Sequence, residues 1–194
     1  MKKYTKTIPF VKSKFIGVLF LLAFLFYGIG RSLFESELDT YKYFGALLMV
    51  INSVAVLLIG FFLRKTIIKF NLLIGNTYFL SRVIEAFALS SILLNLIPEI
   101  SISLDFGYFI AMLFLGIGSI PMCYICYKHN LLPKWMALWG LIGYTLMGFG
   151  FIVELFGKES SMYLLILAGF WEVAFAIWLI ISKQQNKIIE PTYL

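Results

Sequence analysis

Residues 43–63 read YFGALLMVINSVAVLLIGFFL, and this stretch decides the fold. It contains no charged residue, and Asn52 is its most polar side chain. An α-helix rises about 1.5 Å per residue, so about 20 apolar residues cross the hydrocarbon core of a bilayer, which is about 30 Å thick. The stretch therefore predicts a helix that spans a membrane.

Similar apolar runs recur along the whole chain. Of its 194 residues, 61% are hydrophobic and 13% are charged, and the mean hydropathy is +0.94. Soluble domains have about 45 to 50% apolar and about 25% charged residues, so a soluble fold is excluded. We expect an all-α membrane protein, a six-transmembrane-helix bundle that forms one polytopic domain over residues 1–194. The expected spans are 15–31, 43–63, 72–97, 106–127, 135–156 and 162–182.

Basic residues gather on one side of this expected bundle. They include Lys12, Lys14, Arg64, Lys65 and Lys128, all at the ends of spans. The opposite side is mainly acidic, with Glu35, Glu37, Asp39, Glu99, Asp105 and Glu159. Positive charge marks the cytoplasmic side of membrane proteins, so we expect both termini in the cytoplasm. The formal net charge of +6 reflects this topology, and we expect no nucleic-acid partner because no folded basic surface exists to bind one.

Two full charges interrupt the third span, in SRVIEAF at residues 81–87. At the membrane centre Arg82 and Glu85 together cost about 5 to 7 kcal/mol on an insertion scale, which roughly cancels what the apolar residues of this span return. The helical rise places both near mid-depth, and Asn52 and Glu172 reach the same level on the second and sixth spans. The third helix is therefore marginal alone and needs polar neighbours.

The third span has a polar face, because Tyr78, Arg82 and Glu85 are spaced by three and four residues. We expect this face to turn toward the other helices rather than toward lipid. Our hypothesis is that Arg82 is held between Glu85 and Glu172, since a planar guanidinium can serve two carboxylates. Asn52 is expected to supply a further hydrogen bond. Alanines four residues to either side of Glu172 leave room for a neighbouring backbone.

The charges of this cluster do not cancel. One arginine faces two glutamates, so either one carboxylate carries a proton, or a cation or a chain of waters joins the cluster. Two interpretations stay open. The cluster is a structural clamp that orders the bundle, or it is a site for a proton or a substrate.

Two weaker signals concern the first, fourth and fifth spans. Arg31 closes the first span and Glu154 lies near the outer end of the fifth, so we expect a shallow pair between them. In the fourth span the motif GIGSIP brings together Gly116, Gly118 and Pro121. Such residues loosen or kink a helix, so this segment is either a packing kink or a gate.

Cysteine and histidine meet once in the sequence, where Cys123 and Cys126 precede His129. They supply three ligands, whereas a structural zinc site needs four, and the spacing does not suit covalent haem. We expect two reduced thiols, no metal and no cofactor. The chain lacks H-E-x-x-H, G-x-S-x-G and P-loop motifs, which disfavours an enzyme. Carboxylate chemistry stays open at Glu85, Glu154 and Glu172.

Three stretches of the chain resemble a known family. They are GNTYFLSRVIEAF from Gly75, LLPKWMALWGLIGY ending at Tyr144, and WEVAFAIWLI from Trp171. Their order and spacing are similar to those of a bacterial six-helix integral-membrane family of unknown function, the DUF4386 type. This resemblance implies a multi-pass protein of the bacterial cytoplasmic membrane, and it brings no activity with it.

Three classes of function follow as alternatives. The first is a non-catalytic membrane subunit or partner-binding protein, the second a small transporter or proton-linked permease, and the third an intramembrane enzyme. The partners expected are the lipid bilayer and either a second copy of the chain or another membrane protein. What surrounds Arg82 separates the first two classes, because a clamp predicts a dry contact and a transporter predicts a cavity.

Overall fold

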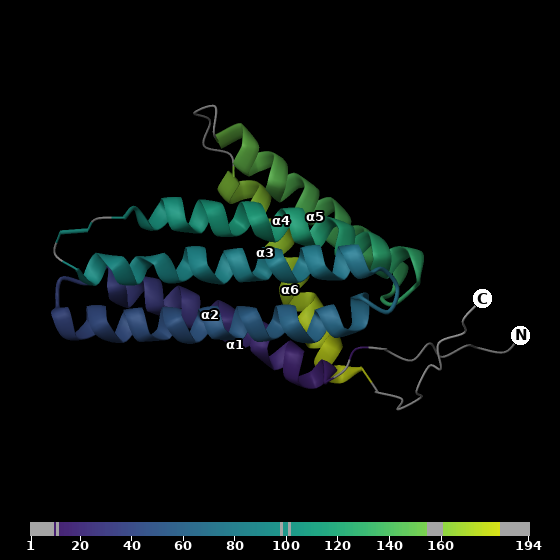
Figure 1. Cartoon of the computed structure of the whole chain (residues 1–194), viewed down its shortest axis with the longest axis horizontal. Helices are drawn as coiled ribbons and strands as arrows, with labels where there is room; N and C mark the ends of the chain where they lie inside the picture. The colour runs from purple at the N-terminus through teal and green to yellow at the C-terminus, as the bar shows by residue number, and fades with distance from the viewer. Residues whose placement is uncertain (1–9, 11, 98, 101, 155–160, 183–194) are drawn as a thin grey trace, which may run out of the picture.

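Helices account for nearly all of the chain that the computed structural model describes, which is residues 10, 12–97, 99–100, 102–154 and 161–182. These residues contain no strand. The elements in chain order are α1 (Ser13–Phe34), α2 (Asp39–Ile67), α3 (Leu72–Ser90), the 3-10 helix η1 (Ser91–Leu96), α4 (Leu104–Lys128), α5 (Lys134–Glu154) and α6 (Ser161–Ile181) (Figure 1). The expected all-α, six-helix fold is confirmed.

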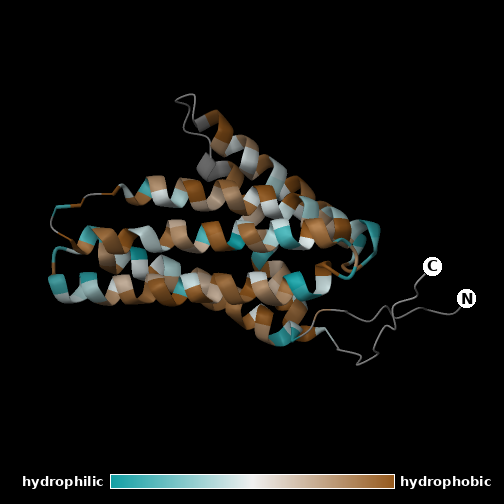
Figure 2. Cartoon of the chain, viewed as in Figure 1, coloured by the Kyte–Doolittle hydropathy of each residue, from teal (hydrophilic) through white to brown (hydrophobic). Residues whose placement is uncertain are grey.

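Hydrophobic residues predominate along the helices, as the brown segments of Figure 2 show, and many of them lie on the outside of the bundle. Large side chains such as Leu73, Phe87 and Ile181 are 75%, 70% and 71% exposed. All six helical segments are long and apolar enough to cross a bilayer. Water would not tolerate so continuous an apolar surface, whereas lipid requires it. The protein is therefore a multi-pass membrane protein.

The six helices form a ring. Each helix packs against the next one in the chain, and α6 packs back against α1. The α2–α3 and α4–α5 connections lie at one end of the bundle, and the α1–α2 and α3–α4 connections lie at the other (Figure 1). In this view α2, α3 and α4 run side by side, and α1, α5 and α6 run at an angle to them. This arrangement surrounds an interior to which every helix contributes.

The motif GIGSIP does not interrupt α4, which continues as one helix from Leu104 to Lys128 with Pro121 inside it. Gly118 brings α4 close to α3, because a Cβ at this position would overlap the Ser81 hydroxyl and lie 3.3 Å from the Tyr78 Cα. A side chain here would push the two helices apart. The contact with α3 thus explains Gly118 by packing, and nothing in the structure tests a gate.

The third span ends differently from the expectation of one helix over 72–97. Its α-helix ends at Ser90 and continues as the 3-10 helix η1. The Ser91 hydroxyl donates to the Ala88 carbonyl at 2.7 Å. Asn95 then exchanges two hydrogen bonds with the backbone of Ile102, at 2.7 and 2.6 Å. Local side-chain bonds of this kind compete with the α-helical ladder and tighten its last turns.

Candidate functional site

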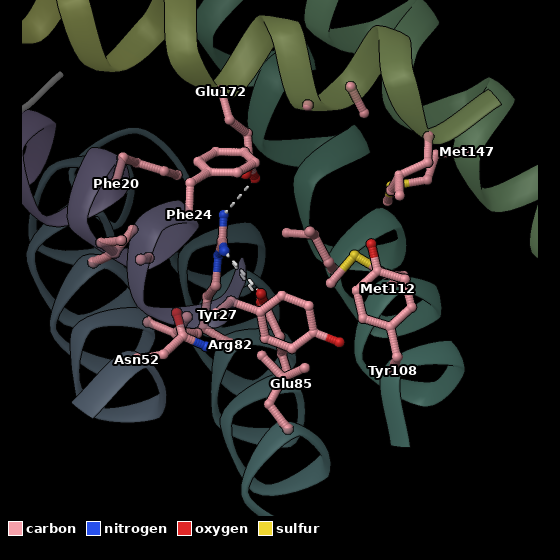
Figure 3. Close-up of a pocket in the computed structure, with 18 of the residues that line it drawn as sticks. Phe20, Phe24, Tyr27, Asn52, Arg82, Glu85, Tyr108, Met112, Met147 and Glu172 are labelled. Carbon is pink, nitrogen blue, oxygen red and sulfur yellow. Dashed lines mark hydrogen bonds and ion pairs between the residues drawn. The ribbon is translucent and has the colours of Figure 1, made fainter. Parts of the chain in front are cut away.

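Arg82 lies at the centre of the bundle and is 2% exposed. Its Nε donates to the Tyr78 hydroxyl at 3.0 Å. Its Nη1 donates to the two carboxylate oxygens of Glu85 at 3.1 and 3.3 Å, and Figure 3 shows these two residues together. Across the bundle its Nη2 donates to Glu172 Oε1 at 3.4 Å. The structure thus brings Arg82 into contact with the two glutamates, as the sequence led us to expect.

A glycine on α2 lets the arginine stem reach this position. A Cβ at Gly60 would lie 2.7 Å from the Cβ of Arg82, so α2 passes α3 at this point without a side chain between them. On its other side the guanidinium carbon lies 5.5 Å from the centre of the Phe20 ring of α1. The cation is therefore enclosed by α1, α2 and α6 as well as by its own helix.

Glu172 is held from two sides. Its Oε1 accepts a hydrogen bond from the Tyr144 hydroxyl of α5 at 2.7 Å in addition to the bond from Arg82. The neighbouring Trp171 is fully buried and donates its indole N–H to the Met136 carbonyl at 2.7 Å, which fixes α6 against α5. Among the described residues, Glu172 Oε2 has no hydrogen-bonding partner.

The alanines on either side of Glu172 do admit neighbouring backbones, but those of α1 and α5 rather than α3. A Cβ at Gly17 of α1 would lie 2.5 Å from the Ala176 carbonyl oxygen. A Cβ at Gly143 of α5 would lie 3.3 Å from the Ala168 backbone. Arg82 therefore reaches Glu172 with its long side chain, across the interior of the ring.

The expected hydrogen bond between Asn52 and Arg82 does not occur. Asn52 is 2% exposed, and within the described residues its amide has no hydrogen-bonding partner. It lies in the wall of a cavity instead (Figure 3). The α2 helix does bring Asn52 to the level of the cluster, but depth along a helix does not determine which groups touch.

This cavity has a volume of about 220 Å³ and is lined by residues from all six α-helices. Arg82, Glu85, Glu172 and Asn52 form the polar part of its wall. The rest is aromatic and aliphatic, and includes Phe20, Phe24, Tyr27, Tyr108, Met112 and Met147 (Figure 3). The charged cluster thus borders a space that a small molecule could occupy.

The cavity reaches the surface between α1 and α6. Phe24 and Ile166 both line it, yet they are 43% and 51% exposed on the bundle. At the neighbouring Gly169, a Cβ would meet nothing within 4 Å. The same two helices are in tight contact further along, at Gly17 and Ala176. They separate toward the α1–α2 end and leave an opening that faces lipid.

Two tyrosines cover the cavity toward the α1–α2 end. The rings of Tyr27 and Tyr108 stack with their centres 5.4 Å apart, and both line the cavity. Just beyond them Arg31 joins α1 to α4 through Asp105 at 2.6 Å, and it also pairs with Glu35 at 3.0 Å. Arg31 was expected to pair with Glu154, whose side chain lies outside the described residues.

The two cysteines and the histidine lie in different surroundings. Cys123 and Cys126 are both buried and unpaired, and the Cys126 thiol lies 3.6 Å from the Met122 sulfur. The exposed His129 ring lies against Phe70, with 4.9 Å between ring centres. Within the described ranges, no three residues among histidine, cysteine, aspartate and glutamate are placed to hold a metal ion.

Fold and site together define a class, a six-helix membrane protein with an arginine–glutamate cluster on a central cavity. Residues 99–182 match the family described as Domain of unknown function (DUF4386), which confirms the resemblance seen in the sequence. This part of the chain includes Tyr144 and Glu172, whereas Arg82 and Glu85 lie before it. No curated protein and no solved structure matches the chain.

Sequence reasoning missed Tyr144, the second donor to Glu172. A buried tyrosine in the middle of an apolar span is a signal, because its hydroxyl needs a partner away from water. Tyr27 and Tyr108 were missed for a related reason, since a tyrosine near the end of a span is normally assigned to the membrane interface. Their stacking becomes visible only when α1 and α4 are placed side by side.

Proposed function

We propose that the protein is a small transporter that binds a low-molecular-weight, largely apolar ligand in its central cavity. The observation that carries this proposal is that Arg82, Glu85 and Glu172 border a cavity of about 220 Å³. A purely structural clamp needs no space beside it. The wall of this space combines a few charged groups with aromatic and aliphatic side chains, as the binding sites of small molecules do.

The charge count supports a transporter linked to protons. One arginine against two glutamates leaves one excess negative charge when both carboxylates are ionised. A proton on one carboxylate or a bound cation restores neutrality, and burial makes neutrality important because an unpaired charge is costly away from water. The cluster can therefore exchange a proton for a ligand. A subunit that only binds a partner protein would require neither the cavity nor the excess charge.

The opening between α1 and α6 supplies a route to the cavity. Phe24 and Ile166 stand where the cavity meets the lipid-facing surface, so an apolar ligand can reach it from the bilayer. The Tyr27–Tyr108 stack covers the cavity toward one end of the bundle. A ligand that enters from lipid and leaves past this stack would cross toward one membrane surface.

The proposal is tested by filling the cavity. Gly169 and Gly148 each have open space where a Cβ would stand, but only Gly169 lines the cavity. Gly169→Leu should therefore occupy the cavity without disturbing helix packing, and Gly148→Leu is its matched control. The probes are three labelled one-ring molecules of similar size, namely benzylammonium, benzyl alcohol and benzoate, and the readouts are binding in nanodiscs and counterflow into proteoliposomes.

We expect at least one probe to bind saturably and to exchange across the vesicle membrane with the wild-type protein and with Gly148→Leu. Gly169→Leu should abolish both. The proposal is wrong if none of the three probes binds, or if Gly169→Leu binds and exchanges them as the control does.

A further inference from the structure

The polar part of the cavity wall has two carboxyl groups for one cation, so it is one negative charge in excess when both carboxyl groups are ionised. Among the described residues that line the cavity, Arg82 is the one cation, and it faces Glu85 and Glu172. Glu85 lies with both oxygens within 3.3 Å of Nη1, so these two groups largely neutralise each other. Glu172 makes the longer contact, at 3.4 Å from Nη2. Of the two glutamates, Glu172 is thus the one with the single, longer contact to the arginine, and its second oxygen makes no contact with it.

Two polar groups in this wall, the half-buried Glu172 carboxylate and the buried Asn52 amide, have unused hydrogen-bonding capacity. Within the described part of the chain, neither Glu172 Oε2 nor the side-chain amide of Asn52 has a partner. Asn52 is 2% exposed, so water outside the bundle does not satisfy it. An unsatisfied buried polar group costs about 1 to 3 kcal/mol. The Glu172 carboxylate can only accept hydrogen bonds when it is ionised, which indicates a ligand that donates them, whereas the Asn52 amide can accept or donate.

The remaining wall suits a cation with an apolar body. Phe20, Phe24, Tyr27 and Tyr108 present aromatic rings to the cavity. The faces of such rings attract ammonium groups, most strongly where water is excluded. A cavity of about 150 Å³ accepts benzene, so about 220 Å³ accepts one ring with a short substituent.

We infer that the cavity takes a small protonated primary amine with an apolar body, whose ammonium group is bound by Glu172. The inference rests on the proposed function, because it names the ligand class of the same cavity. The ammonium donates to Glu172 Oε2 and supplies the missing positive charge, while the apolar body lies among the aromatic rings. Asn52 provides a second hydrogen-bonding point on the opposite part of the wall (Figure 3).

An anionic ligand fits the site less well. Arg82 is the only cation among the lining residues described, and three of its nitrogens already donate to Tyr78, Glu85 and Glu172. An anion would have to approach the guanidinium between two carboxylates. At separations of about 4 Å, like charges repel each other by several kcal/mol in a partly buried site.

Benzylammonium, benzyl alcohol and benzoate distinguish these possibilities, because they share a ring and a similar size but differ in charge. Equilibrium binding is measured for the wild-type protein in nanodiscs at neutral pH. We expect benzylammonium to bind at least tenfold more tightly than benzyl alcohol, and benzoate to bind weakest. Glu172→Gln should weaken benzylammonium at least tenfold and leave benzyl alcohol within threefold, and Glu172→Asp should restore part of the loss.

Each outcome has a distinct meaning. Equal affinity for benzylammonium and benzyl alcohol would overturn the inference about the amine. Tightest binding of benzoate would overturn it too. Either result would leave the proposed transport function of the cavity in place. If none of the three probes binds saturably, both proposals are overturned. The wild-type comparison alone decides the ligand class, so the result does not depend on whether Glu172→Gln folds.

Discussion

At the scale of single residues, Arg82 is the cation that connects the polar groups of the bundle interior. It holds two carboxylates from different helices and is itself 2% exposed. Its position in the third span was evident from the sequence, because a full charge in an apolar run must find partners in the bundle. The identity of Glu172 as partner also followed from depth. Depth could not predict Tyr144, since hydrogen-bond geometry depends on how α5 is rotated about its axis.

Replacement of Arg82 should lower the free energy of unfolding more than replacement of the partly exposed Arg64 does. Arg82→Met leaves the buried Glu85 and the half-buried Glu172 without their cation, and breaking a buried ion pair typically destabilises a protein by about 3 to 5 kcal/mol. Unfolding in mixed micelles with increasing SDS, followed by circular dichroism, measures the change. Arg64→Met is the control, because Arg64 makes an exposed hydrogen bond to Asn76 at 2.9 Å and should cost about 1 kcal/mol. Equal losses for the two variants would contradict the central role of Arg82.

Tyr144 should be coupled energetically to Glu172. Its hydroxyl donates to Oε1 at 2.7 Å, and a hydrogen bond to a charged group contributes about 1.5 to 3 kcal/mol. A double-mutant cycle with Tyr144→Phe and Glu172→Met, which removes the acceptor, measured by the same unfolding assay, should give a coupling energy in this range. A coupling energy below about 0.5 kcal/mol would mean that Tyr144 does not hold the carboxylate.

At the scale of elements, the contact between α1 and α6 determines where the cavity opens. The two helices touch at Gly17 and Ala176 and separate at Phe24 and Gly169. The sequence predicts both helices by their hydropathy, and the alanines beside Glu172 predict a close approach. It does not say which helix makes that approach, because many apolar helices can pack against a stripe of small residues.

Two glycines of α1 provide a matched test of this contact. A Cβ at Gly17 would lie 2.5 Å from the Ala176 carbonyl oxygen, whereas a Cβ at Gly28 would meet nothing within 4 Å. Gly17→Ala should therefore destabilise the protein by about 1 to 3 kcal/mol, as overpacked contacts do. Gly28→Ala should not destabilise it, because alanine is at least as good a helix former. The unfolding assay compares the variants, and equal effects would contradict the close approach of α1 and α6.

At the scale of the whole molecule, the six spans followed from the sequence because lipid imposes length and hydropathy on every crossing helix. The ring order did not follow, since apolar helices carry little information about their neighbours. The cavity did not follow either, because a void depends on side chains from all six helices at once. Residues such as Phe24 and Met112 look like ordinary core or lipid-facing positions until α1 and α4 are placed around the same space.

The orientation in the membrane is a further prediction for the whole molecule. Lys65 and Lys69 at the α2–α3 end contrast with Glu35, Glu37 and Asp39 at the α1–α2 end, so the positive-inside rule places the α2–α3 end in the cytoplasm. The variants Lys69→Cys and Glu37→Cys each add one exposed cysteine. Reaction of that cysteine with a membrane-impermeant maleimide shows which side of the membrane it is on. The two native cysteines are buried and should stay unlabelled in the folded protein.

In intact bacterial spheroplasts, Glu37→Cys should be labelled and Lys69→Cys should react only after the membrane is permeabilised. The Tyr27–Tyr108 stack lies toward the end that carries position 37, so this result would place the covered side of the cavity toward the cell exterior. The opposite labelling pattern would mean that the protein has the inverted orientation in the membrane. The covered side of the cavity in the proposed transporter would then face the cytoplasm. Labelling of both positions in intact spheroplasts would contradict a single orientation.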